Sequence, residues 1–118
     1  MNSFRTPEKQ AEYKEVRKHF KNAHVCALCE KTSIEEYEYW RIVKNDYPYD
    51  KIAKIHNMLI PKRHVTEEEF NMEEERELKD IKKKLLDSDY EFIIEATKHK
   101  KSIPEHFHLH LIITKDEF

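Results

Sequence analysis

Glycine is absent from all 118 residues of the sequence. Glycine-rich loops bind phosphate because the missing side chain lets backbone N–H groups approach the phosphate oxygens closely. Both the P-loop and the G-x-G-x-x-G turn of dinucleotide-binding folds depend on such glycines. The composition therefore excludes P-loop and Rossmann-type nucleotide sites.

Long apolar runs are also missing. No segment is long enough to span a membrane, and the first ten residues, MNSFRTPEKQ, contain no apolar signal core. A strong excess of positive charge is lacking too, because 22 Lys and Arg face 24 Asp and Glu, for a net charge of -2. A protein that binds nucleic acid in general relies on neutralising many phosphates. We therefore expect a cytoplasmic protein with neither a membrane nor nucleic acid in general as its partner.

Cysteine is scarce, and its two copies, Cys26 and Cys29, form a C-x-x-C motif. In a reducing compartment this spacing indicates metal or redox chemistry rather than a structural disulfide. A structural zinc would need two further ligands, and histidines would complete a Cys2His2 set. Spacing alone does not select which of the eight histidines take part, and a pair of inert reduced thiols is the alternative.

Hydrophobic periodicity predicts two main helices. The first covers residues 6–22, with Thr6 as its cap, Pro7 in its first turn, and Tyr13, Val16 and Phe20 on one face. The second begins at Thr66, where Glu69 completes a capping box, and runs to Leu86. Its predicted buried stripe consists of Phe70, Leu78, Ile81 and Leu85.

Runs rich in aromatic and β-branched residues predict four strands. They cover residues 36–44, 54–60, 90–96 and 106–113, with a turn or loop at 45–50. Strands and helices in this order, joined by short connections, favour an α+β fold with a mostly antiparallel sheet. We expect residues 1–118 to form a single domain.

The last predicted strand, EHFHLHLII at residues 105–113, has a histidine at every second position: His106, His108 and His110. Alternate side chains of a strand share one face, so the apolar residues between them enter the core. Three interpretations remain open. The histidines form an exposed polar face, or H-x-H supplies metal ligands, or one histidine is a nucleophile supported by the others.

Several motifs resemble those of the histidine-triad (HIT) superfamily. The segment H-F-H-L-H-L-I at 106–112 resembles its signature, and C-A-L-C at 26–29 is similar to the zinc-binding C-x-x-C of many members. Residues 56–65, H-N-M-L-I-P-K-R-H-V, resemble its H-x-L-V-I-P-K-x-H segment. N-D-Y-P-Y at 45–49 and S-I-P-E-H at 102–106 resemble the dinucleoside polyphosphate phosphorylase and nucleotidylyltransferase branch. The resemblance implies an α+β fold with an antiparallel sheet, and a homodimer.

The resemblance also implies a role for each matching residue. A structural zinc would be bound by Cys26, Cys29, His64 and His106. His108 would be the nucleophile that forms a covalent nucleotidyl-histidine, and His110 would contact the phosphate under attack. The substrate-binding residues would be Asn45, His56 and Ser102.

The expected function is therefore that of a zinc-containing nucleotide hydrolase or nucleotidyl transferase. It would act at the α-phosphate of a nucleotide or dinucleotide. The alternative function is a non-catalytic nucleotide-binding or zinc-stabilised interaction module. A third hypothesis is a metalloenzyme in which all three triad histidines bind one metal. Intact His108 and His110 favour catalysis, and the C-x-x-C favours a structural zinc.

Overall fold

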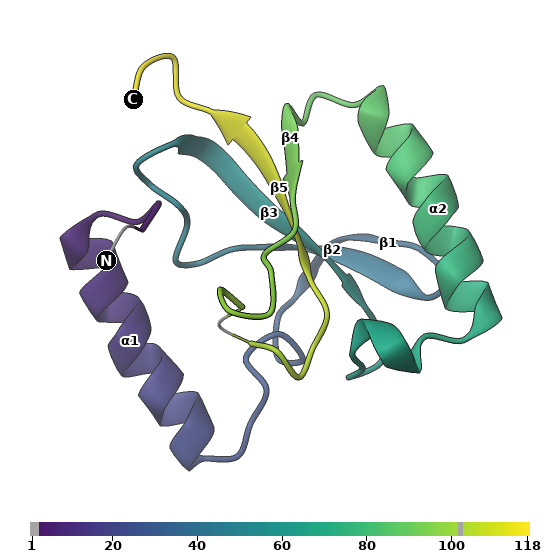
Figure 1. Cartoon of the computed structure of the whole chain (residues 1–118), viewed down its shortest axis with the longest axis horizontal. Coiled ribbons are helices and arrows are strands. Elements are labelled where there is room, and N and C mark those ends of the chain that lie inside the picture. Colours follow the sequence, from purple (N-terminus) through teal and green to yellow (C-terminus); the bar gives the residue numbers. More distant parts are fainter. Residues whose placement is uncertain (1–2, 102) are drawn as a thin grey trace.

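The structure is a computed structural model that describes residues 3–101 and 103–118. Within these residues, two α-helices accompany a five-stranded antiparallel sheet with strand order β1-β2-β3-β5-β4 (Figure 1). The predicted α+β class is therefore confirmed. In chain order the elements are α1 (Pro7–Asn22), β1 (Ser33–Glu36), β2 (Trp40–Lys44), β3 (Ala53–Pro61), a short 3-10 helix (Glu67–Glu69), α2 (Met72–Leu86), β4 (Phe92–Ile94) and β5 (Leu109–Thr114).

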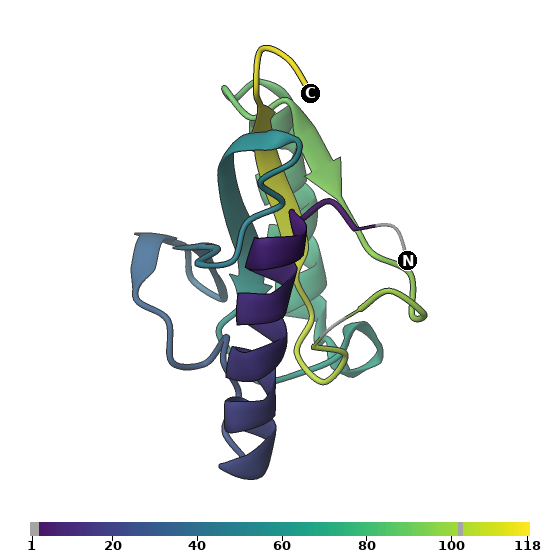
Figure 2. The same ribbon diagram turned by 90° about the vertical axis from the view of Figure 1, so that its left-hand side faces the viewer.

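Helix α1 begins where the sequence predicts. The Thr6 side chain accepts a hydrogen bond from the backbone N–H of Lys9 at 3.3 Å, and Pro7 occupies the first turn. Figures 1 and 2 show α1 and α2 on opposite sides of the sheet. No residue of α1 is buried, whereas α2 buries Glu74, Ile81 and Leu85. Helix α1 therefore lies beside the sheet and contributes no buried residue to the main core.

The predicted second helix is interrupted near its start. Thr66 and Glu69 form the predicted capping box, but only around the short 3-10 helix. Phe70 is then extended, and Asn71 caps α2 in a second capping box with Glu74. The break turns the Phe70 ring toward the aromatic core, where it packs edge-on against Trp40 and Phe107. The end of the helix at Leu86 is as predicted.

Three of the four predicted strands are corrected by the structure. Residues 36–44 are not one strand, because β1 and β2 form a hairpin that turns at residues 37–39. The turn is held from α2, where the Glu77 carboxylate accepts the backbone N–H groups of Glu38 and Tyr39. The predicted strand 90–96 is shorter and pairs with β5 only over Phe92–Ile94.

The histidine strand also begins later than predicted, at Leu109. Residues 103–106 form a turn, and the backbone N–H of Phe107 donates to the oxygen of Val65 at 2.8 Å instead of pairing with β3. Only His110 of the three histidines therefore lies in the strand. The strand predicted at 54–60 is confirmed as β3, one residue longer at each end.

The sheet buries a different cluster on each face. The face toward α2 contains the larger cluster, made of Trp40, Ile42, Leu59, Ile81, Leu85, Phe107, Leu109 and Leu111. Leu78 of α2 and Phe70, which precedes α2, pack against it, so all four residues of the predicted stripe contact this cluster although Phe70 lies outside the helix. The smaller cluster consists of Leu28, Val43, Met58, Ile60 and Ile103.

Neither helix in the part of the chain that the structure describes combines the length and the apolar character that a membrane span requires.

Candidate functional site

Four predicted metal ligands lie together at one end of the sheet. They come from the loop after α1, the segment after β3 and the turn before β5, and their ligand atoms lie within 4.8 Å of one another: Cys26, Cys29, His64 and His106. The sulfur-to-Nδ1 distances are 3.5 Å for Cys26 and His106, and 3.4 Å for Cys29 with each histidine. Usual Zn–S and Zn–N bond lengths place such atoms about 3.5 Å apart in a tetrahedral site. Donor types and spacing therefore fit zinc.

The hydrogen bonds of His106 select the nitrogen that faces this cluster. Its Nε2 lies 3.0 Å from the backbone oxygen of Pro61, so Nε2 carries the proton and donates it. Nδ1 is then unprotonated, and it faces the two cysteine sulfurs. A metal-binding histidine is commonly oriented in this way, by a carbonyl on its other nitrogen. His106 is also only 1% exposed, so its orientation is fixed by packing.

Two arginines hold the loops that present these ligands. Arg41 of β2 donates to three backbone oxygens within residues 28–31. Arg63 forms two hydrogen bonds with the buried Glu74 carboxylate, at 2.9 and 2.6 Å, and so fixes the segment that carries His64. A bidentate arginine–carboxylate pair has a defined geometry. The metal ligands are therefore positioned by contacts of their own loops.

His108 lies beside the cluster but not in it. Its Nδ1 donates to the backbone oxygen of His106 at 3.0 Å, which leaves Nε2 unprotonated. Burial lowers the pKa of His108, because the charged imidazolium loses hydration in the interior. A neutral imidazole with a free lone pair is a nucleophile or a base. Within the described residues, the metal-ligand group includes neither His108 nor His110, so no metal site unites the three histidines.

His110 belongs to a directed chain of hydrogen bonds. The backbone N–H of Tyr49 donates to Nδ1 of His56 at 3.0 Å, so the proton of His56 is on Nε2. That nitrogen donates to Nδ1 of His110 at 2.8 Å, which places the proton of His110 on Nε2. Burial lowers the pKa of His56 to about 3 and that of His110 to about 2. His110 is thus a neutral donor through Nε2, which lies 3.2 Å from the hydroxyl oxygen of Tyr49.

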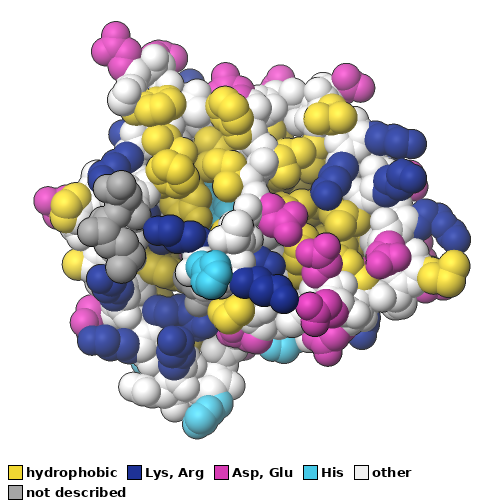
Figure 3. Space-filling model, in the orientation of Figure 1, with side chains coloured by type: hydrophobic (Ala, Val, Ile, Leu, Met, Phe, Trp, Pro, Cys, Tyr) yellow, Lys and Arg dark blue, Asp and Glu magenta, His cyan; other side chains and the backbone are white. Residues whose placement is uncertain are grey.

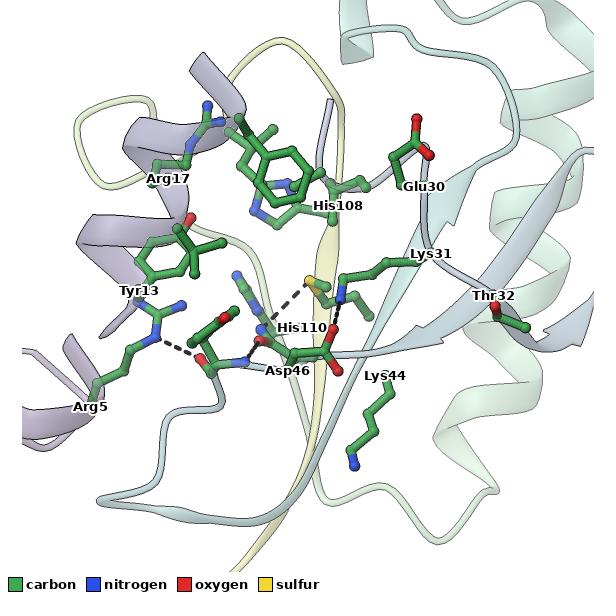
Figure 4. A pocket seen from close by; sticks show the side chains of 18 residues that line it. Arg5, Tyr13, Arg17, Glu30, Lys31, Thr32, Lys44, Asp46, His108 and His110 are labelled. Atoms are coloured by element: carbon green, nitrogen blue, oxygen red, sulfur yellow. Dashed lines mark hydrogen bonds and ion pairs between the residues drawn. The ribbon is translucent and has the colours of Figure 1, made fainter. Parts of the chain in front are cut away.

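A cavity of about 500 Å³ lies between α1 and the sheet. Figure 4 shows Arg5, Tyr13 and Arg17 on the side of α1, facing Lys31 and other residues across the cavity. Three predicted site residues line the cavity: Asn45, His108 and His110. A cavity of this size suits a small molecule.

One predicted substrate-binding residue, His56, does not line the cavity. His56 is 4% exposed and lies behind His110, and its Nε2 is 3.3 Å from Nδ2 of Asn45. Ser102 lies outside the described residues. Arg5 and Arg17 also line the cavity and were not among the predicted site residues. For Arg17 a signal existed, because it follows Tyr13 by four residues on the same helical face.

Comparison with protein-family models gives no match, and neither does comparison with curated proteins. Solved structures are similar. A HIT family hydrolase from Clostridium thermocellum has a TM-score of 0.57 and 24% identity, over 77% of this chain and 91% of that chain. A HIT family hydrolase from Legionella pneumophila Philadelphia 1 has a TM-score of 0.55 and 19% identity, over 74% of this chain and 90% of that chain. A histidine triad protein from Clostridium difficile has a TM-score of 0.55 and 15% identity, over 79% of this chain and 92% of that chain. The chain therefore has the fold of histidine-triad proteins.

Proposed function

We propose that this chain is a zinc-containing nucleotide hydrolase or nucleotidyl transferase of the histidine-triad superfamily, with residues 1–118 acting as one domain. Its motifs favour the dinucleoside polyphosphate phosphorylase and nucleotidylyltransferase branch. The observation that carries the proposal is the state of His108. Burial keeps its ring neutral, and the oxygen of His106 holds the proton on Nδ1. Nε2 is then available for attack in a small-molecule cavity.

The reaction begins when Nε2 of His108 attacks the α-phosphorus of the substrate. The new N–P bond forms as the bond from phosphorus to the leaving oxygen breaks, and the electron pair departs with that oxygen. Nε2–H of His110, which faces the Tyr49 hydroxyl without substrate, would donate to a phosphoryl oxygen as negative charge moves during transfer. Water, inorganic phosphate or another acceptor then takes the nucleotidyl group and restores the neutral histidine.

The metal has a structural role in this proposal. Cys26, Cys29, His64 and His106 would supply all four ligands of a tetrahedral zinc, so the metal would have no position for substrate. Holding His106 also fixes the backbone oxygen that orients His108. Asn45 lines the cavity and takes the ribose or phosphate contact that the resemblance implies. Ser102 would lie near the leaving oxygen, on the same resemblance.

The direct test is to trap the covalent intermediate. The protein is incubated with nucleoside mono-, di- and triphosphates and with dinucleoside polyphosphates, and its intact mass is measured without acid treatment. We expect one nucleotidyl group to be added, at His108 by peptide mapping. Tight nucleotide binding without an adduct or turnover would overturn the proposal in favour of a binding module.

We also expect a homodimer, formed by pairing of the β4 edges of two copies. β4 is an edge strand of the sheet, next to β5, and its Phe92 side chain is 55% exposed. Light scattering at micromolar concentration should give twice the chain mass of 14.5 kDa. Phe92→Glu should reduce the mass to that of one chain, because it places a charge at the edge. Ile34→Glu, on the opposite edge strand β1, is the control, and a monomeric parent would contradict the expectation.

A further inference from the structure

Arg5 is a buried arginine in the wall of the cavity. It is 8% exposed, its Nε donates to the backbone oxygen of Tyr47 at 2.6 Å, and its Nη1 is 3.4 Å from Oε1 of Gln10. Its guanidinium carbon lies 4.1 Å from the ring centroid of Tyr13 and 5.0 Å from that of Tyr49. These contacts fix the position of the guanidinium but provide no negative charge.

No carboxylate forms an ion pair with Arg5 within residues 3–101 and 103–118. The carboxylate of Asp50 attracts it from a distance, but both of its oxygens accept hydrogen bonds from Thr6. A buried charge is costly unless an opposite charge and hydrogen bonds compensate for it. Accordingly, burial lowers the pKa of Arg5. An anionic ligand in the cavity would provide the compensating charge.

Tyr13 supplies a second, independent observation in the same wall. Its hydroxyl oxygen is buried and, among the described residues, has no hydrogen-bond partner. Most buried polar atoms in proteins are paired, so an unpaired hydroxyl on a side chain that lines a cavity indicates a ligand that accepts its proton. Tyr13 and Arg5 both line the cavity that contains His108 and His110. A phosphate oxygen can accept from both side chains.

The position of Arg5 relative to His108 suggests which phosphate it binds. The ring centroids of His108 and His110 lie 5.1 Å apart, and those of His110 and Tyr49 lie 4.9 Å apart. Arg5 contacts the Tyr49 ring in turn. Figure 4 shows Arg5 and His108 toward opposite ends of the cavity, with Tyr13 and His110 between them. In phosphoryl transfer the attacking and leaving atoms lie roughly in line with the phosphorus. A leaving group in line with His108 would point away from that ring, and Arg5 lies in the part of the cavity away from His108.

We propose that Arg5 and Tyr13 form an anion subsite for a second phosphate of the substrate, the one that leaves when His108 attacks the first. The subsite rests on the proposed function of His108 and narrows its substrate to a nucleotide with at least two linked phosphates. The bridging P–O bond breaks, and its electron pair goes to the departing phosphate, where the Arg5 guanidinium and the Tyr13 hydroxyl donate to it. Figure 3 shows further Lys and Arg side chains over α1, which would attract such an anion.

Binding of inorganic pyrophosphate tests the subsite without any transfer chemistry. By calorimetry, Arg5→Gln should weaken pyrophosphate binding roughly 10- to 100-fold, as expected for loss of a hydrogen bond to a charged group. Lys18→Gln is the matched control, because it removes one positive charge from α1 but its side chain is 71% exposed. It should leave the affinity unchanged. Equal affinities for the parent and Arg5→Gln would overturn the subsite.

Tyr13→Phe separates ligand binding from folding. The variant removes a buried hydroxyl without a partner, so its melting temperature should equal or exceed that of the parent. Its affinity for pyrophosphate should nevertheless fall several-fold. A lower melting temperature with unchanged affinity would show that the hydroxyl serves the fold, and would remove Tyr13 from the subsite.

Two substrates with the same nucleotidyl group complete the test. One is a nucleoside diphosphate, and the other is a nucleoside monophosphate nitrophenyl ester, whose leaving group carries no phosphate. Arg5→Gln should lower kcat/KM for the diphosphate at least 10-fold more than for the ester, and equal losses would overturn the subsite. If the parent forms no adduct with either substrate while pyrophosphate binding still depends on Arg5, the function of His108 fails and the anion subsite stands.

Discussion

His108→Asn is expected to abolish nucleotidyl transfer, with a loss in kcat/KM on the order of 10⁴-fold or more, because it removes the attacking atom. Asparagine is chosen because its amide N–H can replace the Nδ1–H bond to the backbone oxygen of His106. The variant thus keeps the local hydrogen bond and lacks only the nucleophilic Nε2. Metal content and melting temperature should remain close to those of the parent.

His110→Ala provides a graded comparison for this prediction. His110 donates through Nε2 rather than attacking, and loss of one such donor typically costs about 10²- to 10³-fold in kcat. The intact mass should show an adduct on His110→Ala but none on His108→Asn. Near-parental turnover by His108→Asn, or an adduct on it, would show that another residue is the nucleophile.

Local signals predicted the helices better than the strands. Thr6 and Pro7 start α1 through contacts within one turn, and the predicted capping box at Thr66 forms, although it caps the short 3-10 helix and not α2. The strand at 36–44 failed for a non-local reason, because Glu77, some forty positions away, accepts the backbone N–H groups that turn the hairpin. No pattern within nine residues carries that information.

The histidine segment shows the same limit within the site. Alternation on one strand predicts one shared face, and the resemblance assigns His106 to metal. In the structure His106 is separated from the other two histidines. The turn at 103–106 directs its Nδ1 toward the cysteines, whereas His108 and His110 line the cavity. Arg5 was not predictable, because its role depends on the fold bringing the N-terminal segment against residues 47–49.

Loss of the metal is expected to destabilise the fold as well as the site. The protein purified without added metal should contain about one equivalent of zinc, and Cys26→Ser should lose it. The ligands join the loop after α1, the segment after β3 and the turn before β5, so a bound metal cross-links three parts of the chain. Because a structural zinc binds the folded state, its binding free energy adds to stability.

The free energy of unfolding of Cys26→Ser should therefore fall by several kilocalories per mole in denaturant titrations. A chelator should lower the melting temperature of the parent in the same way, and added zinc should restore it. His19→Ala is the control, because it removes an exposed histidine that lies outside the metal-ligand group. Cys26→Ser should also lose turnover, because His106 positions the oxygen that orients His108, whereas His108→Asn should lose turnover alone. Fully folded parent protein without metal, or a Cys26→Ser variant as stable as the parent, would refute the structural role of the site.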